Sequence, residues 1–547
     1  MNAVIWIVAG VAVILLAGAV AKKTRLGAPL LLVAIGMAVS LLPAVPAIEI
    51  EPEWVLAGVL PPLLYSAAVR MPLVDFRREF ATISAFSVAL VIVTAVLAGL
   101  AIHFAVPRFP LHVAIALGAI ISPTDAAATA IIAKAGAPRR VLTILEGESL
   151  LNDATSLVTL RTAVAASVSF AGMAWDFIWA IGAAVTVGAV VGWLAMRLGA
   201  HITDPTLHTL YSFLIPFAAY LPVEKLGSSG LVSVVVAGLI TGRGAYRYSS
   251  ATNRLTQQVN WQTVDVLAEG AIFLAMGLQL FGLHQEFVAE QDSLVTTALT
   301  AALGLLVVLV VRGVFTWALL TWRRLSARRQ VADAAPARRR TAARPSPQAP
   351  LGWREGMVLE WAGLRGVVTL AAAQTLPLDT PERPALVLIA FAVAAVSLIG
   401  QGASLPWLIR LLGLGADDPA EDLAWRMRLR QQLAQTAQEF LAGPAEQLKR
   451  PGGERFSAPA LELAKSTANW VTVPNTDEPR PSTDNPPAAL HREELRELRL
   501  ATVRQMRRSL TSAAKQAAFP APVLRQALDE LDREELALGL DPPAAET

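Results

Sequence analysis

The sequence predicts an all-α, polytopic membrane protein of about thirteen transmembrane helices, followed by a helical cytoplasmic tail. Three observations predict this fold. Apolar stretches close to the roughly 20 residues that a spanning helix requires recur up to about residue 412. Lys and Arg gather in alternate connections between these stretches. Charged residues make up only 16% of the chain, whereas about 25% is usual in soluble proteins.

The composition also excludes several kinds of site. Hydrophobic residues make up 54% of the chain and the mean hydropathy is +0.51, so lipid is the expected solvent. The net charge of +3 is too small to predict nucleic-acid binding. Cysteine is absent, which rules out disulfides and thiolate metal sites, and the histidines show no metal-ligand spacing.

The apolar stretches are interpreted as membrane helices in chain order. The first lacks a basic leader, so we interpret it as a retained membrane helix rather than a signal peptide. The expected helices lie at 3–21, 28–45, 52–69, 80–104, 111–134, 141–168, 175–198, 207–222, 228–242, 260–282, 294–320, 356–376 and 384–411.

The connections predict the orientation. If the N-terminus lies outside, the odd-numbered connections face the cytoplasm, and these carry nearly all of the Lys and Arg. The even-numbered connections carry only Arg108, Lys225 and Arg383. By the positive-inside rule we expect a multi-pass protein of the cell (inner) membrane with a cytoplasmic C-terminal tail.

Two regions are expected outside the membrane. The basic, Ala/Pro-rich residues 323–352 are interpreted as a solvated loop, with binding of anionic lipid headgroups as the alternative. In the tail, 413–547, the stretches 420–442 and 491–540 have helical spacing, and 471–489 is interpreted as a linker. Regulation, dimer contact and a simple solvated appendage all stay open for the tail.

The fifth expected helix contains Ser122-Pro123-Thr124-Asp125 between apolar flanks. Pro123 removes a backbone donor and clashes with the preceding turn. Thr124 and Asp125 compete for backbone hydrogen bonds. We therefore expect a broken helix whose unwound centre lies at mid-membrane, where exposed carbonyls can coordinate a cation. The alternative is a proline kink capped by Asp125.

The sixth expected helix carries Glu148, Ser149, Asn152 and Asp153 on one stripe, because their spacing is i, i+1, i+4 and i+5. Each charge at bilayer depth costs about 2.5–3.5 kcal/mol on insertion scales, so it needs a partner or a function. The stripe supplies the oxygen ligands that a hard alkali cation prefers. The alternative is a buried ion-pair network between helices.

Two arginines lie deep in later apolar stretches. Arg312 needs an anionic partner, for which Glu148 is the candidate, unless it snorkels from a helix end. Arg365 lies in G-L-R-G, whose glycines predict a second broken helix. We expect its guanidinium to neutralise the carbonyl ends of half-helices and to pair with Asp125. The two broken helices are seven spans apart and so run oppositely, as in transporters with inverted halves.

Three motifs in this order resemble those of the monovalent cation/proton antiporters, specifically the NhaP-like sodium/proton exchanger branch. They are S-P-T-D at 122–125, G-E-S-L-L-N-D at 147–153 and G-L-R-G at 363–366. The resemblance covers most of residues 1–412 and implies a fold of two inverted repeats within each chain, in which the two discontinuous helices cross. It also implies that two chains form a homodimer. It assigns the helices of about 80–168 and 294–411 to a core domain, and those of about 3–69 and 207–282 to a dimer domain.

The resemblance also implies residue roles. Asp153 would carry either the cation or the proton, and Asn152, in place of a second aspartate, implies electroneutral exchange. No resident cofactor is implied; the substrates are Na⁺ and H⁺, in a protein surrounded by membrane lipid. The residues implied to bind Na⁺ are Asp153, Glu148, Ser149 and Thr124, with Asn152 beside them, and the implied structural charges are Asp125, Arg312 and Arg365.

Other functions are weighed against exchange. A K⁺/H⁺ exchanger would use the same ligand types. A cation channel could line a pore with the same oxygens, and a symporter of organic anions would need fewer buried carboxylates. An intramembrane aspartyl protease would use Asp125 and Asp153, but its Y-D and G-x-G-D signatures are absent, so no enzyme is predicted.

Overall fold

The structure is a computed structural model whose regular elements are all helices. The chain divides into two structural units. Unit 1 comprises Met1–Met196, Ser212–Arg243 and Trp261–Ala416, and unit 2 comprises Arg197–Tyr211, Gly244–Asn260 and Asp417–Thr547. The structure describes residues 2–23, 27–42, 51, 53–125, 127–165, 170–248, 250–289, 293–334, 351–377, 379–415, 419–443, 448, 450, 455–467, 486–516 and 518–540.

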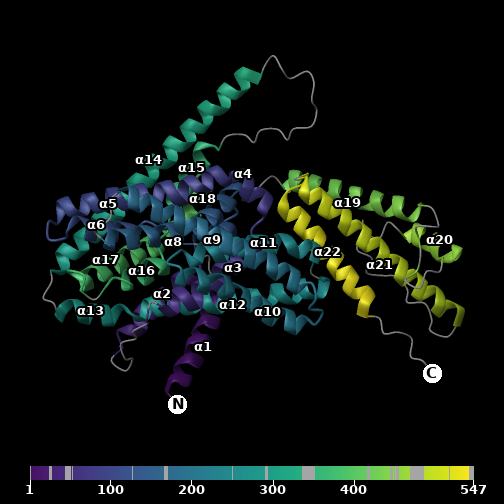
Figure 1. Ribbon diagram of the computed structural model, residues 1–547, viewed down its shortest axis with the longest axis horizontal. Helices are drawn as coiled ribbons and strands as arrows, with labels where there is room; N and C mark the ends of the chain where they lie inside the picture. Colours follow the sequence, from purple (N-terminus) through teal and green to yellow (C-terminus); the bar gives the residue numbers. More distant parts are fainter. Residues whose placement is uncertain are drawn as a thin grey trace. The chain divides into compact units, whose positions relative to one another are not determined.

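Helices lie over every predicted apolar stretch (Figure 1). Among the described residues, 7 helices are long and apolar enough to cross a membrane, and shorter apolar helices accompany them. The helices up to the first predicted interruption are α1 (Asn2–Lys23), α2 (Ala28–Ser40), the π-helical η1 (Trp54–Val59), α3 (Leu60–Arg70), α4 (Leu73–Ser84), the π-helical η2 (Ala85–Leu90) and α5 (Val91–Ala105).

The helices that follow include two pairs of half-length segments, which are described with the site below. The longer helices are α8 (Arg139–Ala165), α9 (Phe170–Gly199), α10 (Pro205–Lys225), α11 (Gly230–Tyr248), α12 (Ala251–Leu278), α13 (Leu280–Ala289) and α14 (Leu294–Ala334), and the last segments of unit 1 are α17 (Arg383–Val396), the π-helical η3 (Ser397–Gln401) and α18 (Gly402–Leu411).

Close backbone approach packs the centre of unit 1. Helix α5 contacts α8, α14 and the half-length helix α6 (Leu111–Ile121). At the α5–α6 crossing, a Cβ on Gly99 would lie 2.6 Å from the Cα of Ile115, and one on Gly118 would overlap the carbonyl oxygen of Ala95. Glycine therefore lets the two backbones touch, and α6 is buried along most of its length.

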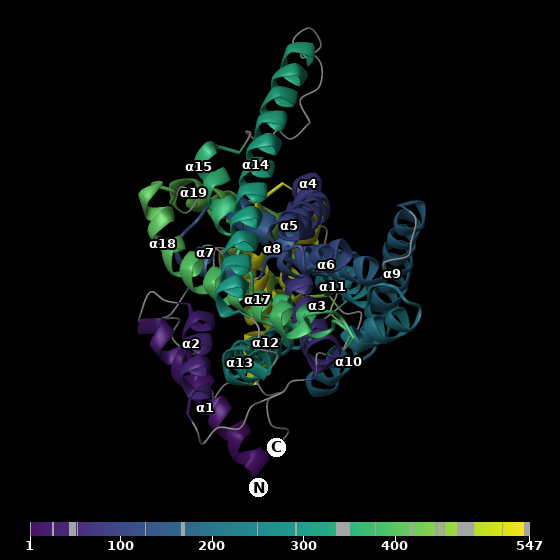
Figure 2. The same ribbon diagram turned by 90° about the vertical axis from the view of Figure 1, so that its left-hand side faces the viewer.

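The structure corrects the prediction of a loop at 323–352. Helix α14 continues to Ala334, and its C-terminal part extends past its neighbours in unit 1 in both views (Figures 1 and 2). The Ala, Arg and Gln residues of this segment are good helix formers. Arg323 donates to Glu79 and Arg324 donates to the carbonyl of Leu351, so the start of the extension is bonded to other parts of unit 1. Residues 335–350 of the predicted loop lie outside the described residues.

The tail helices agree with the two predicted helical stretches, and a helix at 458–467 was not predicted. They are α19 (Pro419–Leu441), α20 (Ala458–Thr467), α21 (Pro486–Lys515) and α22 (Ala521–Leu540). Part of the predicted linker is also wrong, because residues 486–489 begin α21, and proline suits a first helical turn. Residues 471–485 lie outside the described residues.

An apolar core and a buried ion network hold unit 2 together. Leu433 of α19, Met506 of α21 and Leu528 of α22 belong to one buried cluster. The carboxylate of Asp532 accepts hydrogen bonds from Arg254, at the start of α12, and from Arg507. The tail is therefore bonded to the segment at the start of α12.

Candidate functional site

The first predicted helix break is confirmed. Helix α6 ends at Ile121, and α7 (Ala127–Lys134) resumes the helical path, with residues 123–125 non-helical between them. The hydroxyl of Ser122 donates to the carbonyl of Ala119 (2.9 Å), so it closes the last turn of α6. Thr124 is buried in the unwound segment.

The second predicted break is confirmed as well, and it meets the first. Helix α15 (Trp353–Trp361) and α16 (Val367–Gln374) flank the non-helical residues 362–366. The backbone N–H of Asp125 donates to the carbonyl of Leu364 (2.7 Å). A Cβ on Gly366 would overlap the Asp125 carboxylate, so glycine is required for this approach. The two interrupted helices therefore meet at their unwound centres.

Arg365 bonds the open ends of both half-helices. Its Nε donates to the carbonyl of Ile121 (3.1 Å) and its Nη2 to that of Ser122 (3.3 Å), at the end of α6. Its Nη1 donates to the carbonyl of Gly363. The expected neutralisation of helix ends is thus observed. The expected association with Asp125 takes another form, because it is the backbone of Asp125 that bonds the loop beside Arg365.

The predicted partner of Arg312 is confirmed. Its Nη1 and Nη2 lie 2.5 Å and 2.9 Å from the two carboxylate oxygens of Glu148, and both side chains are 1% exposed. The Nε of Arg312 donates to the carbonyl of Leu359 (2.9 Å), near the end of α15. The guanidinium carbon also lies 5.3 Å from the centre of the Phe86 ring. Arg312 is therefore a buried cation with a bidentate anionic partner.

Thr124 and Asn152 join the first interruption to α8. The hydroxyl of Thr124 donates to Glu148 Oε1 (3.0 Å). The amide nitrogen of Asn152 donates to both the carbonyl oxygen (2.9 Å) and the hydroxyl oxygen (2.8 Å) of Thr124. The amide oxygen of Asn152 is buried and has no hydrogen-bond partner in the described part of the chain. That oxygen is available to a ligand.

Asp153 is the unbonded carboxylate of the site. Asp153 is only 6% exposed, and its carboxylate interacts electrostatically with Asp125. Across the described ranges its carboxylate has neither a hydrogen bond nor an ion pair. Ser149, one turn earlier on α8, donates its hydroxyl hydrogen to the carbonyl of Glu146 (3.1 Å). The lone pairs of the hydroxyl oxygen can therefore coordinate a cation. The stripe therefore offers an unpaired carboxylate next to neutral oxygens.

Sequence reasoning missed some supporting residues. Phe86, from the π-helical η2, lies against Arg312, and Ser397, from the π-helical η3, accepts a hydrogen bond from the backbone of Arg365. Aromatic and serine residues are ordinary in apolar helices, so nothing in the sequence marks them. Their importance comes from the tertiary contact alone.

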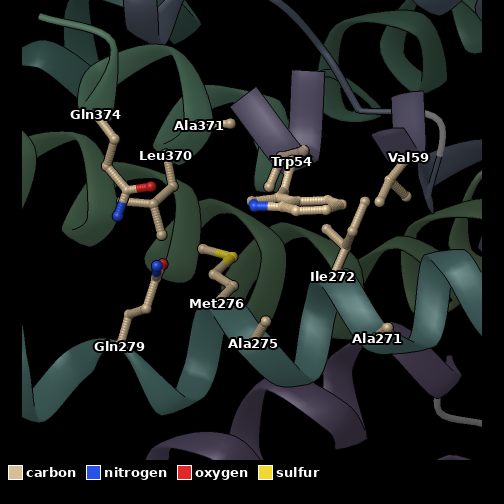
Figure 3. A pocket seen from close by; sticks show the side chains of 11 residues that line it. Trp54, Val59, Ala271, Ile272, Ala275, Met276, Gln279, Leu370, Ala371 and Gln374 are labelled. Atoms are coloured by element: carbon tan, nitrogen blue, oxygen red, sulfur yellow. The ribbon is translucent and has the colours of Figure 1, made fainter. Parts of the chain in front are cut away.

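A pocket of about 180 Å³ lies beside α16. Its lining is mostly apolar and comes from η1, α12, α16 and Gln279, which directly follows α12. Figure 3 shows the indole of Trp54 reaching in among the side chains of α12 and α16, with the amides of Gln279 and Gln374 facing each other at one end. In the predicted domain organisation, η1 and α12 belong to the dimer domain and α16 to the core. The pocket is thus a space between helices that are predicted to move against each other.

Comparison with known proteins identifies the family. A family model described as "Sodium/hydrogen exchanger, transmembrane" matches residues 11–411. This chain belongs to the sodium/hydrogen exchanger family. It is accordingly a multi-span membrane protein and a monovalent cation/proton antiporter rather than an enzyme, so the protease alternative is excluded.

Relatives of this exchanger support the assignment. An uncharacterised Na⁺/H⁺ exchanger of Mycobacterium tuberculosis is 30% identical over 99% of this chain and 97% of its own. A sodium, potassium, lithium and rubidium/H⁺ antiporter of Bacillus pumilus is 28% identical over 70% of this chain and 57% of its own. The structure of the sodium proton antiporter MjNhaP1 from Methanocaldococcus jannaschii at pH 8 superposes with a TM-score of 0.58 and 18% identity, covering 76% of this chain and 99% of that one. The exchanger therefore has an NhaP1-like fold.

Proposed function

We propose that this antiporter exchanges Na⁺ for H⁺ by alternating access, with Asp153 binding either ion. This proposal rests on a difference between two buried carboxylates on α8. Glu148 is bonded by Arg312 and Thr124, whereas Asp153 has no such bond within the described residues. An uncompensated buried charge is costly, so Asp153 needs a proton or a cation. Binding one ion then displaces the other.

The other ligands follow from the oxygens near Asp153. The amide oxygen of Asn152 is buried without a bond to any described residue, and Ser149 keeps a free lone pair on its hydroxyl oxygen. The carbonyl and hydroxyl oxygens of Thr124 complete the set of candidate ligands, and Glu148 balances the charge of Arg312. Because Asn152 is neutral, the site carries one titrating charge, which supports exchange of one proton for one cation.

The arrangement in the membrane is part of the same proposal. We place the N-terminus outside and the tail in the cytoplasm, with about thirteen spanning helices in two inverted repeats. The alternating charge of the connections and the oppositely running interrupted helices support this topology. The helices of about 3–69 and 207–282 would form the homodimer, and the core would move against them.

A K⁺/H⁺ exchanger is the second candidate. The antiporter of Bacillus pumilus is named for potassium and rubidium as well as sodium, and it is 28% identical to this chain. Oxygen ligands of these types suit each alkali cation. Competition between Na⁺, Li⁺ and K⁺ in one vesicle assay would separate the candidates, because the preferred cation shows the lowest apparent KM.

Proteoliposomes with an internal pH-sensitive dye test the proposal. An outward-directed cation gradient should drive proton uptake by the native protein, and Asp153→Asn should reduce it to the level of protein-free vesicles. Asp204→Asn is the matched control, because Asp204 is an exposed acid that caps α10 through the N–H of Leu207 (2.7 Å) and Asn retains that bond. Exchange that survives in Asp153→Asn would reject the assignment.

A further inference from the structure

The second interruption leaves two backbone groups without helical partners, and η3 supplies both. Buried backbone groups need hydrogen-bond partners. The amide nitrogen of Gln401 donates to the carbonyl of Trp361 (3.1 Å), where α15 ends. The backbone N–H of Arg365 donates to the hydroxyl oxygen of Ser397 (3.0 Å). The first and last residues of one π-helical segment therefore bond the two sides of the break.

These bonds form a chain in which each member donates to the next, from the N–H of Arg365 through Ser397 and Gln401 to the carbonyl of Trp361; this chain is called the relay below. The hydroxyl of Ser397 accepts from Arg365, so its single hydrogen is left to donate to the amide oxygen of Gln401. That bond turns the amide nitrogen of Gln401 towards Trp361. Ser397 is fully buried and Gln401 nearly so. In such surroundings each unmade bond is costly, and the members depend on one another.

The relay reaches the candidate site through Arg365. The guanidinium of Arg365 donates to the carbonyls of Ile121 and Ser122, directly before Pro123 and Thr124. Thr124 in turn bonds Asn152, the neighbour of Asp153. The backbone position of Arg365 therefore fixes how the guanidinium meets the first interruption, and so where the oxygens of Thr124 lie.

We infer that Ser397 and Gln401 are positioning residues for ion exchange, acting through Arg365. The inference rests on the proposed function, because it concerns the geometry of the proposed ion site. A π-helical turn suits this role, since such turns recur at functional sites. The hydrogen bond between Ser397 and Gln401 shows that both side chains lie on one face of this turn.

The test compares apparent KM for Na⁺ with maximal rate in proteoliposomes. In Ser397→Ala the N–H of Arg365 loses its acceptor, and we expect apparent KM to rise about tenfold, the effect of one buried hydrogen bond. Ser397→Thr keeps the hydroxyl and should restore the native value. Ser404→Ala is the matched control. Ser404 accepts from the indole N–H of Trp361 (2.9 Å) and donates to the backbone carbonyls of Gly400 and Gln401, but it bonds neither the carbonyl of Trp361 nor the N–H of Arg365. It should leave KM unchanged.

If the Ser397→Ala protein does not fold, a second variant tests the same chain of hydrogen bonds. Gln401→Glu keeps an acceptor for Ser397 but loses the donor to Trp361, so KM should again rise. Native KM in every one of the two variants that folds, or an equal rise in Ser404→Ala, would overturn the positioning role. Native vesicles without exchange, or exchange in Asp153→Asn, would instead overturn the proposed function.

Discussion

The guanidinium of Arg312 faces the carboxylate of Glu148 edge to edge, and each side chain is 1% exposed. Thr124 adds a third bond to the same carboxylate. The pair joins α14 to α8 and, through the carbonyl of Leu359, to the end of α15. Its charges are thus satisfied by each other rather than by water.

Removing one member of this pair should destabilise the protein far more than removing both. Arg312→Met leaves the Glu148 carboxylate buried without a cation, which costs about 3–5 kcal/mol. The double variant Arg312→Met/Glu148→Leu removes both charges and should recover much of that loss. Thermal unfolding in detergent, followed by tryptophan fluorescence, measures the difference. Equal melting temperatures for the single and double variants would contradict the explanation.

Gly118→Ala should separate α5 from α6. Its Cβ would overlap the carbonyl oxygen of Ala95, and the neighbouring backbone cannot yield as a flexible side chain can. We expect a loss of about 1–3 kcal/mol, the usual cost of overpacking. Gly182→Ala in α9 is the control, because its Cβ would meet nothing within 4 Å. There alanine should be neutral or stabilising, since it favours helix over glycine. Comparable melting temperatures in the two variants would refute the argument.

Asn152→Asp tests the charge of the transport cycle. An aspartate cannot donate to the oxygens of Thr124 unless protonated, and it places a second acid beside Asp153. We expect slower exchange whose rate depends on membrane potential, whereas native exchange should be indifferent to it. Proteoliposomes with an imposed K⁺/valinomycin potential provide the measurement, with Na⁺ as the driven ion. Native exchange that responds to potential would contradict the electroneutral cycle.

Asp529 in α22 predicts a pH effect on the tail. Burial, reinforced by the charge of Asp532, raises the pKa of Asp529 above its ordinary value of 3.8. A raised folded-state pKa means that Asp529 contributes stability below 3.8 and that this contribution disappears as the pH rises through the folded-state value. Asp529→Asn resembles the protonated form, so at neutral pH it should increase the hydrogen-exchange protection of α22.

The increase in hydrogen-exchange protection of α22 in Asp529→Asn should become smaller as the pH falls towards 3.8. This comparison requires correction for the pH dependence of intrinsic exchange rates. Glu530→Gln is the neighbouring control. Glu530 and its partner Arg430 are each 40% exposed, and an exposed pair contributes little. A gain in protection that persists unchanged in acid would disprove the titration of Asp529 as the cause.

The sequence predicts those parts of the site that leave a local mark. Pro123 and the glycines around Arg365 favour interruption of a helix, and the buried charge of Arg312 requires an acid such as Glu148. The bond between Ser397 and the backbone of Arg365 is not predictable in this way, because serine is common in apolar helices. It exists only because η3 packs beside the second break.

The extension of α14 shows the converse problem. Basic and Ala-rich residues after 322 suit both a solvated loop and a helix, and composition alone does not separate them. The contacts of Arg323 with Glu79 and of Arg324 with Leu351 favour the helix, and both partners are distant in sequence. Long-range bonds, which periodicity does not reveal, therefore favour the helix where the extension begins.

The bond from the N–H of Asp125 to the carbonyl of Leu364 has a mechanical consequence. This bond joins the two unwound segments, and at Gly366 they pack without space for a side chain. A displacement of either interrupted helix should therefore move the other one as well. An ion held at Asp153 would then be carried by a single stiff frame. In the proposed alternating-access cycle, the movement would then take place at the apolar surfaces around this frame rather than between its two interrupted helices.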